Sequence, residues 1–407
     1  MDENLIIKSF GPIGSLDVRL KKITILIGDQ GTGKSCVAKL FSTFKWLEKD
    51  LMMKRNKPDF YTKGDAFKNK LCHYHRIDSF IQEKTFIKYE SSAYVFIYEK
   101  GKFSIEAKQA EKGSSLPKIM YVPAERLILS VSENKQKLIK ELPDSCSTFS
   151  DEFIDSKNAF KSGFDLPFGN LHYKYDTLNS VSRLWSDGYV DSPVMLRNAS
   201  SGIQSALPLC LVSKYLAVKV KKRESVKLSS RERQQVEREV EEVMNNKDYS
   251  KAVKDSILKQ LSAISSYGSF INIVEEPELN LFPNSQRQVL FSLIEDNNSS
   301  EDNMLLITTH SPYTLAVFNM AMLAAKVMSK TDKVDSREVE NIIPEKYQVS
   351  LSDVAAYSLS VLEENNCRSI LGVETGLISA NDLDSVSEDI SDKFSLLYNL
   401  YANVFHK

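Results

Sequence analysis

Short apolar runs, separated by Gly, Pro and charged residues, divide the chain into segments typical of alternating strands and helices. Residues 23–27 form a continuous apolar run rich in Ile, and residues 118–122, 270–274 and 304–307 form similar runs. Such runs predict strands that are buried on both faces of a sheet. In residues 34–47 the apolar side chains recur at helical spacing, which predicts a helix directly after the first run. The pattern therefore predicts an α/β protein.

Other stretches show different patterns. Residues 80–107 alternate apolar and polar side chains in places, with Gly101 at a turn, which predicts an antiparallel hairpin layer. Residues 219–260 are strongly charged and predict one or two solvated helices, too short for a long coiled-coil arm. The stretch from about residue 331 is amphipathic and leans acidic, and its side chains suggest no chemistry.

Composition limits the class of protein. The 407 residues carry 53 Lys and Arg against 54 Asp and Glu, a net charge of −1, which excludes a uniformly basic nucleic-acid-binding protein but not a local basic groove. Five scattered cysteines without a CxxC pair predict a reducing compartment. The N-terminus has no signal-peptide layout, and polar residues interrupt the most apolar window, residues 313–328. We therefore expect a soluble, cytoplasmic protein that does not contact membranes.

The strongest motif is GDQGTGKS at residues 28–35, which matches the G-x4-G-K-S phosphate loop. Its glycines let backbone amides point at a phosphate, and the following helix adds the positive end of its dipole. We expect Lys34 to reach the β- and γ-phosphates and Ser35 to coordinate Mg²⁺. The nucleotide-binding candidates in this segment are Gly28, Asp29, Gln30, Gly31, Thr32, Gly33, Lys34, Ser35 and Cys36.

Two other strand ends carry chemical groups. Glu275 and Glu276 follow the run at 270–274, where one carboxylate can hold Mg²⁺ and its neighbour can orient or activate water. His310 follows the run at 304–307, and parallel sheets place ligand-binding groups at the carboxyl ends of strands. The catalytic candidates are therefore Glu276, His310 and Lys34, and the metal candidates are Ser35 and Glu275.

Small residues precede the apolar helical stretch that runs to about residue 218. Ser200, Ser201 and Gly202 leave backbone N–H groups exposed at a helix start. Two interpretations stay open from the residues alone: a second anion-binding helix start, with Ser201 and Gly202 as ligands, or an ordinary serine cap.

In the order phosphate loop, SGxQ signature, acidic strand end and histidine, these motifs resemble the heads of ATP-binding cassette (ABC) ATPases. More narrowly, the chain resembles the AAA-type family of overcoming-lysogenisation-defect (OLD) ATPases, with relatives among RecF and SMC-like repair heads. The segments that carry this resemblance are YVPAER, ASSGIQSALPL, EEPELNLFPNSQ and ITTHSPYTL. The likeness covers most of residues 3–320. It implies a P-loop NTPase fold of the ABC-head type, with a mixed central sheet, an antiparallel β layer, a helical signature lobe and a short charged helical insertion.

The resemblance and the patterns together divide the chain into six regions. They are a first part of the ATPase lobe (1–58), an antiparallel β-rich layer (59–116), a signature-containing lobe (117–217), a charged helical insertion (218–262), a second part of the ATPase lobe (263–330) and a C-terminal α/β extension (331–407).

The resemblance also implies roles for the candidate residues. ATP and Mg²⁺ are the implied ligands, Glu275 the acid on the Mg²⁺ side, Glu276 the catalytic glutamate and His310 the switch histidine. Ser201 and Gly202 are implied to contact the γ-phosphate held by a partner subunit, so that two heads close head-to-tail around ATP. The chain departs from the usual pattern in two ways. Glu275 replaces an Asp, and residues 123–126 replace the glutamine loop, where Arg126 is expected either to meet phosphate or to pair with Glu125.

Three biological roles stay open. The first is an ATPase sensor or scaffold in bacterial antiphage defence, forming a homodimer or higher oligomer and working with a separately encoded nuclease or toxin. The second is a RecF-like or SMC-like ATPase that clamps DNA, for which the best basic cluster is Lys219, Lys221, Lys222, Arg223 and Lys227. The third is a nucleotide-gated interaction module with little turnover.

Two further patterns favour no chemistry. Asp382 and Asp384 lie too close to Glu374 for the crossover that a Toprim nuclease needs, so they predict a loop or helix start. Cys72, His73 and His75 fall within four residues, which is poor geometry for one tetrahedral zinc ion.

Overall fold

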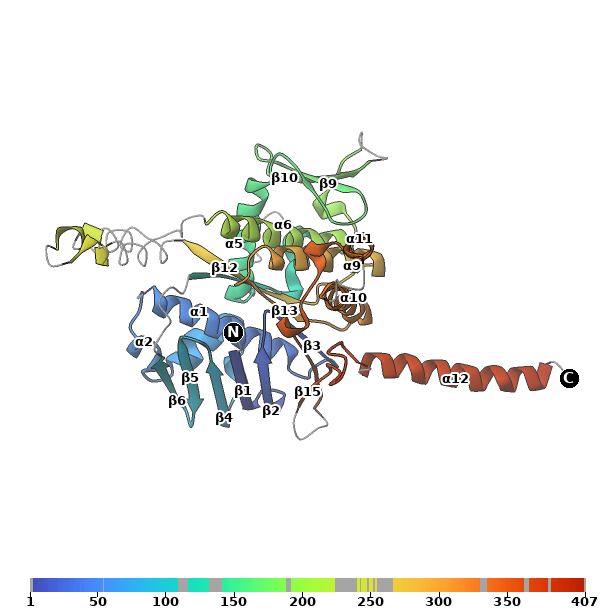
Figure 1. The fold of residues 1–407 in the computed structure, drawn as a ribbon, viewed down its shortest axis with the longest axis horizontal. Coiled ribbons are helices and arrows are strands. Elements are labelled where there is room, and N and C mark those ends of the chain that lie inside the picture. The colour runs from blue at the N-terminus through green and yellow to red at the C-terminus, as the bar shows by residue number, and fades with distance from the viewer. Residues whose placement is uncertain are drawn as a thin grey trace.

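A computed structural model shows the fold (Figure 1). It describes residues 3–53, 55–108, 116–131, 141–187, 192–223, 240–241, 243–246, 249–251, 253–254, 266–329, 335–361, 366–379 and 382–405.

A six-stranded sheet in the order β15-β14-β3-β13-β12-β7 lies at the centre. Five of its strands run parallel, and β15 pairs antiparallel with β14 at one edge. The strands are β3 (Ile23–Gly28), β7 (Leu116–Val122), β12 (Tyr267–Glu275), β13 (Met304–Thr308), β14 (Val354–Leu359) and β15 (Cys367–Ser369). All four predicted strands are confirmed, and every residue of β3 is buried because other layers cover both faces.

The C-terminal region supplies two strands that the sequence patterns did not predict. β14 pairs in parallel with β3 and places Leu359 opposite Gly28, beside the phosphate loop. Its sequence, VAAYSL, is short and contains a single β-branched residue, so it carries little strand signal. Part of the predicted extension at 331–407 thus completes the central sheet.

A five-stranded antiparallel sheet forms a second layer, in the order β2-β1-β4-β5-β6. Its strands are β1 (Glu3–Phe10), β2 (Ile13–Leu20), β4 (Ile81–Glu90), β5 (Tyr94–Glu99) and β6 (Lys102–Ala107). Gly101 lies at the turn between β5 and β6 with φ 75°, as predicted. The sheet takes strands from both sides of the predicted boundary at residue 58.

Helix α1 (Lys34–Met52) packs between the two sheets and shares one hydrophobic core with both (Figure 1). The ring of Phe44 stacks on Tyr89 of β4 with ring centroids 5.1 Å apart. The predicted helix at 34–47 is confirmed and extends to Met52. Because α1 is covered on both sides, its start is held firmly at the end of β3.

Four longer helices cover the opposite face of the central sheet. They are α5 (Asp144–Ala159), α6 (Ser201–Lys221), α9 (Pro283–Asn298) and α10 (Pro312–Met328). Among the described helices, α6 is long and apolar enough to cross a membrane by length and composition, but 78% of its apolar window is buried inside the structure. It packs as a core helix.

The region at 117–217 is less helical than predicted. A small antiparallel sheet, β11-β10-β9-β8, stands beyond α5 and α6. Its strands are β8 (Phe164–Asp165), β9 (Leu171–Asp176), β10 (Val181–Ser186) and β11 (Val194–Met195). Among the described residues, the short helical segments are α2 (Asp59–Thr62), η1 (Phe67–Cys72), η2 (His73–His75), η3 (Asp78–Phe80), η4 (Ala124–Leu127), α3 (Ile128–Val131), η6 (Leu196–Asn198), α11 (Ser336–Ile342), η8 (Glu345–Tyr347) and η9 (Leu351–Asp353).

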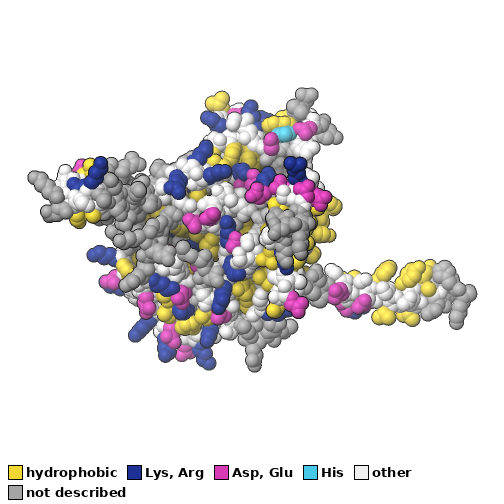
Figure 2. All heavy atoms as spheres, viewed as in Figure 1, with side chains coloured by type: hydrophobic (Ala, Val, Ile, Leu, Met, Phe, Trp, Pro, Cys, Tyr) yellow, Lys and Arg dark blue, Asp and Glu magenta, His cyan; other side chains and the backbone are white. Residues whose placement is uncertain are grey.

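Helix α12 (Asp382–Phe405) projects from the body, and exposed apolar side chains follow its length (Figure 2). Asp382 and Asp384 lie in its first turn, which confirms the prediction of a helix start there. The charged insertion at 218–262 lies largely outside the described residues, as does Lys227 of the predicted basic cluster. Lys219 of that cluster is buried and donates to the Tyr215 hydroxyl at 3.2 Å.

A buried ion network joins α1 to the antiparallel sheet. The Lys45 ammonium donates to Glu3 at 2.7 Å and to Glu48 at 2.8 Å, and all three side chains are at most 8% exposed. The Tyr89 hydroxyl donates to Glu3, and the Ser91 hydroxyl donates to Glu48 at 2.9 Å. One cation thus balances two carboxylates inside the protein.

We expect Lys45→Met to lower the free energy of unfolding by about 3–5 kcal/mol, because it leaves two buried carboxylates without a cation. Urea denaturation measures the change. The matched control is Lys63→Met, since Lys63 is exposed and 3.6 Å from Asp59 and should contribute less than about 1 kcal/mol. Equal losses from the two variants would contradict the assignment.

Candidate functional site

The phosphate-loop sequence forms the turn between the end of β3 and the start of α1. Lys34 is buried, and its ammonium donates to the carbonyl oxygens of Gly28 at 2.7 Å and Asp29 at 2.8 Å. The first turn of α1 contains no acidic residue, so the positive end of the helix dipole is not neutralised there. Ser35 is exposed. The loop therefore presents a cation, a hydroxyl and a helix N-terminus at one strand end.

Two glycines of the loop are required by close packing. Gly28 has φ +140°, and a Cβ added there would lie 2.2 Å from the Leu359 carbonyl oxygen of β14. Gly33 has φ +98°, and a Cβ would lie 2.5 Å from Ile13. L-residues with side chains rarely adopt such φ values, so neighbouring strands fix the path of the loop.

The two predicted acids lie side by side but in different surroundings. Glu275 ends β12 opposite Thr308 and is 4% exposed; its Oε2 accepts a weak hydrogen bond from the Ala124 amide at 3.4 Å. Its Oε1 is buried and makes no hydrogen bond of normal geometry. Glu276 is 34% exposed, has φ 44°, and donates its amide to the Thr308 carbonyl at 2.9 Å. One carboxylate is thus buried and the other is accessible.

His310 lies beside Glu276, and a third acid orients its backbone. The His310 Nε2 is 3.7 Å from Glu276 Oε1. Glu278 Oε1 accepts from the His310 amide at 2.7 Å and from the Thr309 hydroxyl at 2.8 Å. Sequence reasoning gave Glu278 no role; the signal was a third acid in EEPE, two residues after Glu276. Burial raises the pKa of Glu278.

Acidic side chains of the motifs lie close enough to Lys34 to affect its charge. Burial lowers the pKa of Lys34, while Glu276, Asp29, Glu278 and Glu275 oppose that shift. Burial lowers the pKa of His310, and the positive charge of Lys34 lowers it further, so the His310 ring is neutral at pH 7. The loop, both acids and the histidine therefore share one electrostatic environment.

Arg126 has neither of the two roles expected for it. Its guanidinium is 1% exposed and donates to four carbonyl oxygens: those of Glu275 at 2.6 Å, Glu276 at 2.6 Å, Ser205 at 3.1 Å and Pro123 at 3.2 Å. It is too buried to meet phosphate, and it binds backbone instead of the Glu125 carboxylate. Burial lowers the pKa of Arg126 to about 10, so it keeps its charge at pH 7.

This arrangement couples two of the predicted motifs. Ser205 lies in the first turns of α6, the helix that begins with the signature, and the other carbonyls belong to the acidic strand end and the turn after β7. A planar guanidinium with five N–H donors can bind several carbonyls at once. Arg126 thus fixes the backbone of Glu276, in its unusual φ, relative to α6.

The signature residues lie at the start of α6, and Ser201 is exposed. Ser200 is the N-cap residue, but its side chain makes no capping hydrogen bond, so the ordinary serine cap is not what forms here. Gly202 packs against the loop after β12, where a Cβ would lie 2.6 Å from the Asn280 carbonyl oxygen. The helix start therefore stays close to the acidic strand end and keeps its first side chain in solvent.

In the Cys72–His75 segment, the side chains of Cys72 and His75 are buried. Within the described part of the chain, no group of three His, Cys, Asp or Glu side chains could hold a metal ion. The His75 ring contacts Tyr74 and Tyr121, with ring centroids 4.8 and 4.6 Å away. Neither ring nitrogen has a hydrogen-bond partner, and burial lowers the pKa of His75 to about 3.

Comparisons with known proteins find only distant likeness. No family model matches the chain, and no curated protein matches it either. Among solved structures, the Smc head domain derived from Pyrococcus furiosus, bound to the C-terminal domain of ScpA, is 10% identical, with a TM-score of 0.39, 96% of this chain covered and 99% of that chain. The SMC head domain from Thermotoga maritima is 11% identical, with a TM-score of 0.33 and 78% and 91% covered. The recombination mediator protein RecF is 10% identical, with a TM-score of 0.32 and 91% and 98% covered.

With TM-scores below 0.5, this likeness carries no inference about the chain. None of these three structures is named as an OLD ATPase, so that resemblance stays a prediction.

We expect Arg126→Lys to lower the turnover of ATP, the ligand that the sequence resemblance implies, at least about 10-fold. A lysine cannot bind all four carbonyl oxygens at once. The backbone of Glu276 would then shift, and a shift of about 1 Å in a catalytic group lowers the rate by about this factor or more. Unfolding free energy should fall by about 2–4 kcal/mol from the unpaired buried carbonyls. Steady-state kinetics and urea denaturation measure both. Arg197→Lys, at an exposed arginine, is the matched control. Normal turnover in a folded Arg126→Lys protein would contradict the positioning role.

The buried neutral His75 should make the fold acid-sensitive. The unfolded chain protonates this histidine near pH 6.5 and the folded chain near 3, so stability falls as pH drops from 6.5 toward 3. His75→Phe removes this dependence. Between pH 7 and pH 4 wild-type protein should lose about 3 kcal/mol more than the variant, measured by denaturation at each pH. Parallel stability curves for the two proteins would count against a buried neutral ring.

Proposed function

We propose that this chain is an ATP-hydrolysing head of the ABC type. The observation that carries the proposal is convergence at one edge of the central sheet. The phosphate loop follows β3, His310 follows β13 and the two glutamates end β12, and these three strands are neighbours. Because parallel strands end at the same edge, groups from distant parts of the sequence meet there.

Binding of the triphosphate follows from the loop. Backbone amides between Gly28 and Ser35 and the N-terminus of α1 offer donors and a positive dipole end to a phosphate. Lys34 already lies among the loop carbonyls, and its ammonium would exchange them for phosphate oxygens. The acids around it limit the net positive charge, which favours a ligand that brings its own cation.

The residues present fit Mg²⁺. Glu275 has a buried carboxylate oxygen without a hydrogen bond of normal geometry, and Ser35 offers an exposed hydroxyl; hard oxygen ligands of this kind suit the ion. Glutamate in place of the usual aspartate gives the carboxylate a longer arm. The bound ion would neutralise charge on the phosphates.

Glu276 is the group we assign to the attacking water. Its accessible carboxylate accepts the water proton as oxygen attacks the γ-phosphorus, the bond to the β–γ bridging oxygen breaks, and ADP and phosphate leave. His310 is neutral at pH 7 and 3.7 Å from Glu276, so its ring can orient that carboxylate. Arg126 holds the backbone on which Glu276 is carried.

We further propose that a second copy completes the site. Ser201 is exposed at an uncapped helix start, which leaves its hydroxyl and the first amides of α6 able to bind an anion on another molecule. Two heads would then pair head-to-tail with ATP between them, and hydrolysis would release them. The roles in antiphage defence, with a separate effector, and in DNA clamping stay predictions from the sequence resemblance.

We expect Glu276→Gln to bind ATP with near-normal affinity, to form ATP-dependent dimers, and to hydrolyse ATP at least about 100-fold more slowly, because the amide cannot take the water proton. Phosphate release gives the rate, and light scattering after size-exclusion chromatography gives the dimer. Glu301→Gln is the matched control, since Glu301 is exposed before β13, at the opposite end of that strand from the site. Unchanged turnover in Glu276→Gln would remove Glu276 from the catalytic role.

A further inference from the structure

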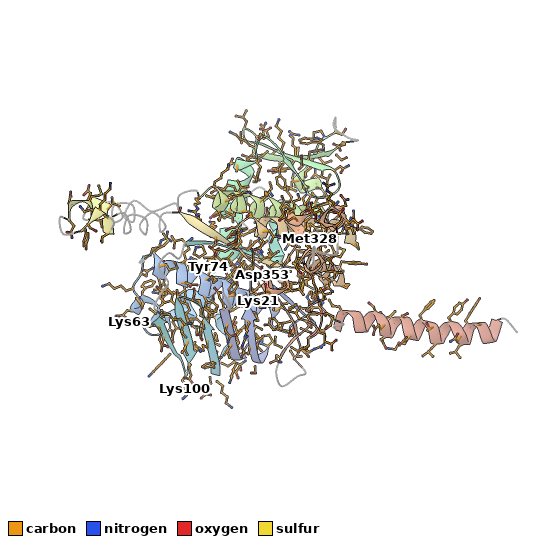
Figure 3. The ribbon with its side chains drawn as sticks, viewed as in Figure 1. Lys21, Lys63, Tyr74, Lys100, Met328 and Asp353 are labelled. Carbon is orange, nitrogen blue, oxygen red and sulfur yellow. The ribbon has the colours of Figure 1, made fainter. Side chains whose placement is uncertain are left out.

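A cavity of about 200 Å³ lies between α1, the η1–η2 turns, α5 and the edge strand β7. Three aromatic rings, those of Trp46, Tyr74 and Tyr121, line it together with His75; Figure 3 labels Tyr74, which lies next to α1. The other lining residues are Ser42, Thr43, Lys70, Leu71, Ile119, Met120 and Thr148. The α1 residues begin eight positions after Lys34, about 12 Å along the helix, so the cavity is separate from the phosphate loop.

His75 is the polar group that points to a ligand. It is 1% exposed, it lines the cavity, and both of its ring nitrogens lack a hydrogen-bond partner. Buried polar atoms almost always have one. A neutral imidazole offers one donor and one acceptor on ring nitrogens that point in divergent directions, so a small ligand on one side of the ring would meet one of the two nitrogens with a matching acceptor or donor.

Four other polar side chains of the lining are already engaged. The Lys70 ammonium lies 3.3 Å from the centroid of the Phe60 ring, the Thr43 hydroxyl donates to the Lys39 carbonyl at 2.9 Å, and the Tyr74 hydroxyl donates to Thr148 at 2.7 Å. Most of the remaining lining is aromatic or aliphatic. A neutral planar molecule is therefore preferred over an anion or a flexible chain.

We propose that this cavity binds a small neutral heterocycle of one or two rings, with a donor or an acceptor on its edge for one ring nitrogen of His75. The size agrees, since an apolar cavity of about 150 Å³ holds one benzene molecule. We also propose that Tyr121 transmits occupancy to the catalytic acids, a second part that rests on the proposed ATPase function.

The register of β7 and β12 supports this coupling. Tyr121 lies opposite Ile273, and Glu275 follows two residues later on the same face of β12. The Tyr121 hydroxyl is buried and close to Glu275, whose carboxylate adds to the effect of burial in raising the pKa of this hydroxyl. A ligand that packs against the Tyr121 ring would shift the hydroxyl away from Glu275 and leave the Glu275 carboxylate free for its role in the proposed ATPase site.

Binding is tested by the fluorescence of Trp46. The chain has two tryptophans, so Trp185→Phe leaves Trp46 as the reporter. We expect adenine or uracil to change its emission saturably, with a Kd between about 10 μM and 1 mM. Benzene, which has neither a donor nor an acceptor, should bind at least about tenfold more weakly than adenine or uracil, and the additional variant His75→Phe should weaken the binding of adenine or uracil by the same factor. Should His75→Phe not fold, Tyr74→Leu, which removes one wall, must weaken binding instead.

A reporter protein that also carries Lys34→Ala distinguishes heterocycle binding in the cavity from binding at the phosphate loop. The heterocycle should bind it unchanged, because the cavity does not use the phosphate loop. No saturable signal up to about 5 mM, equal binding of benzene, or loss of binding in Lys34→Ala would each overturn the cavity proposal.

Coupling is tested by ATP turnover at saturating heterocycle. We expect a rise of about fivefold in otherwise wild-type protein. Tyr121→Phe should bind the heterocycle within about twofold and lose the rise, whereas Tyr98→Phe, at a buried tyrosine outside the cavity, should keep both. Binding without any effect on turnover would overturn the coupling alone. Protein that binds the heterocycle but never hydrolyses ATP would overturn the proposed function and leave the cavity standing.

Discussion

The parallel pairing of β3 with its neighbours is the constraint on which the site depends. Leu26 pairs with Thr308 of β13, Gly28 with Leu359 of β14, and Thr308 in turn with Glu275 of β12. Each pairing fixes where one strand ends relative to the next. The phosphate loop is separated by more than two hundred residues in sequence from the two acids and the histidine, and this register brings them to one edge.

Buried charge is the second feature that shapes the molecule. Arg126 and Lys45 are both almost inaccessible, and each is surrounded by acceptors. A buried cation without partners is strongly destabilising, so each of these residues requires its neighbours to stay in place. Arg126 thereby joins the acidic strand end to the signature helix, and Lys45 joins α1 to the antiparallel sheet.

Strongly local signals were interpreted correctly from the sequence. The apolar run at 23–27 is a strand, the helical spacing after Lys34 is a helix, and the phosphate loop lies between them. The loop needs only neighbouring residues, because its glycines, lysine and serine act within one turn. Glu275, Glu276 and His310 were predicted to lie at strand ends for a related reason, since each lies within three residues of the end of a strong apolar run.

Residues that act through distant partners could not be found in this way. β14 has little pattern of its own and becomes a strand because β3 offers a free edge. Arg126 resembled a phosphate ligand or an ion-pair partner until the carbonyls around it were known, and Glu278 had no visible role before His310 lay beside it. The sequence by itself determined the chemistry and the local elements. Tertiary structure decided which groups share a site, because hydrogen bonds and burial join residues that the chain order keeps far apart.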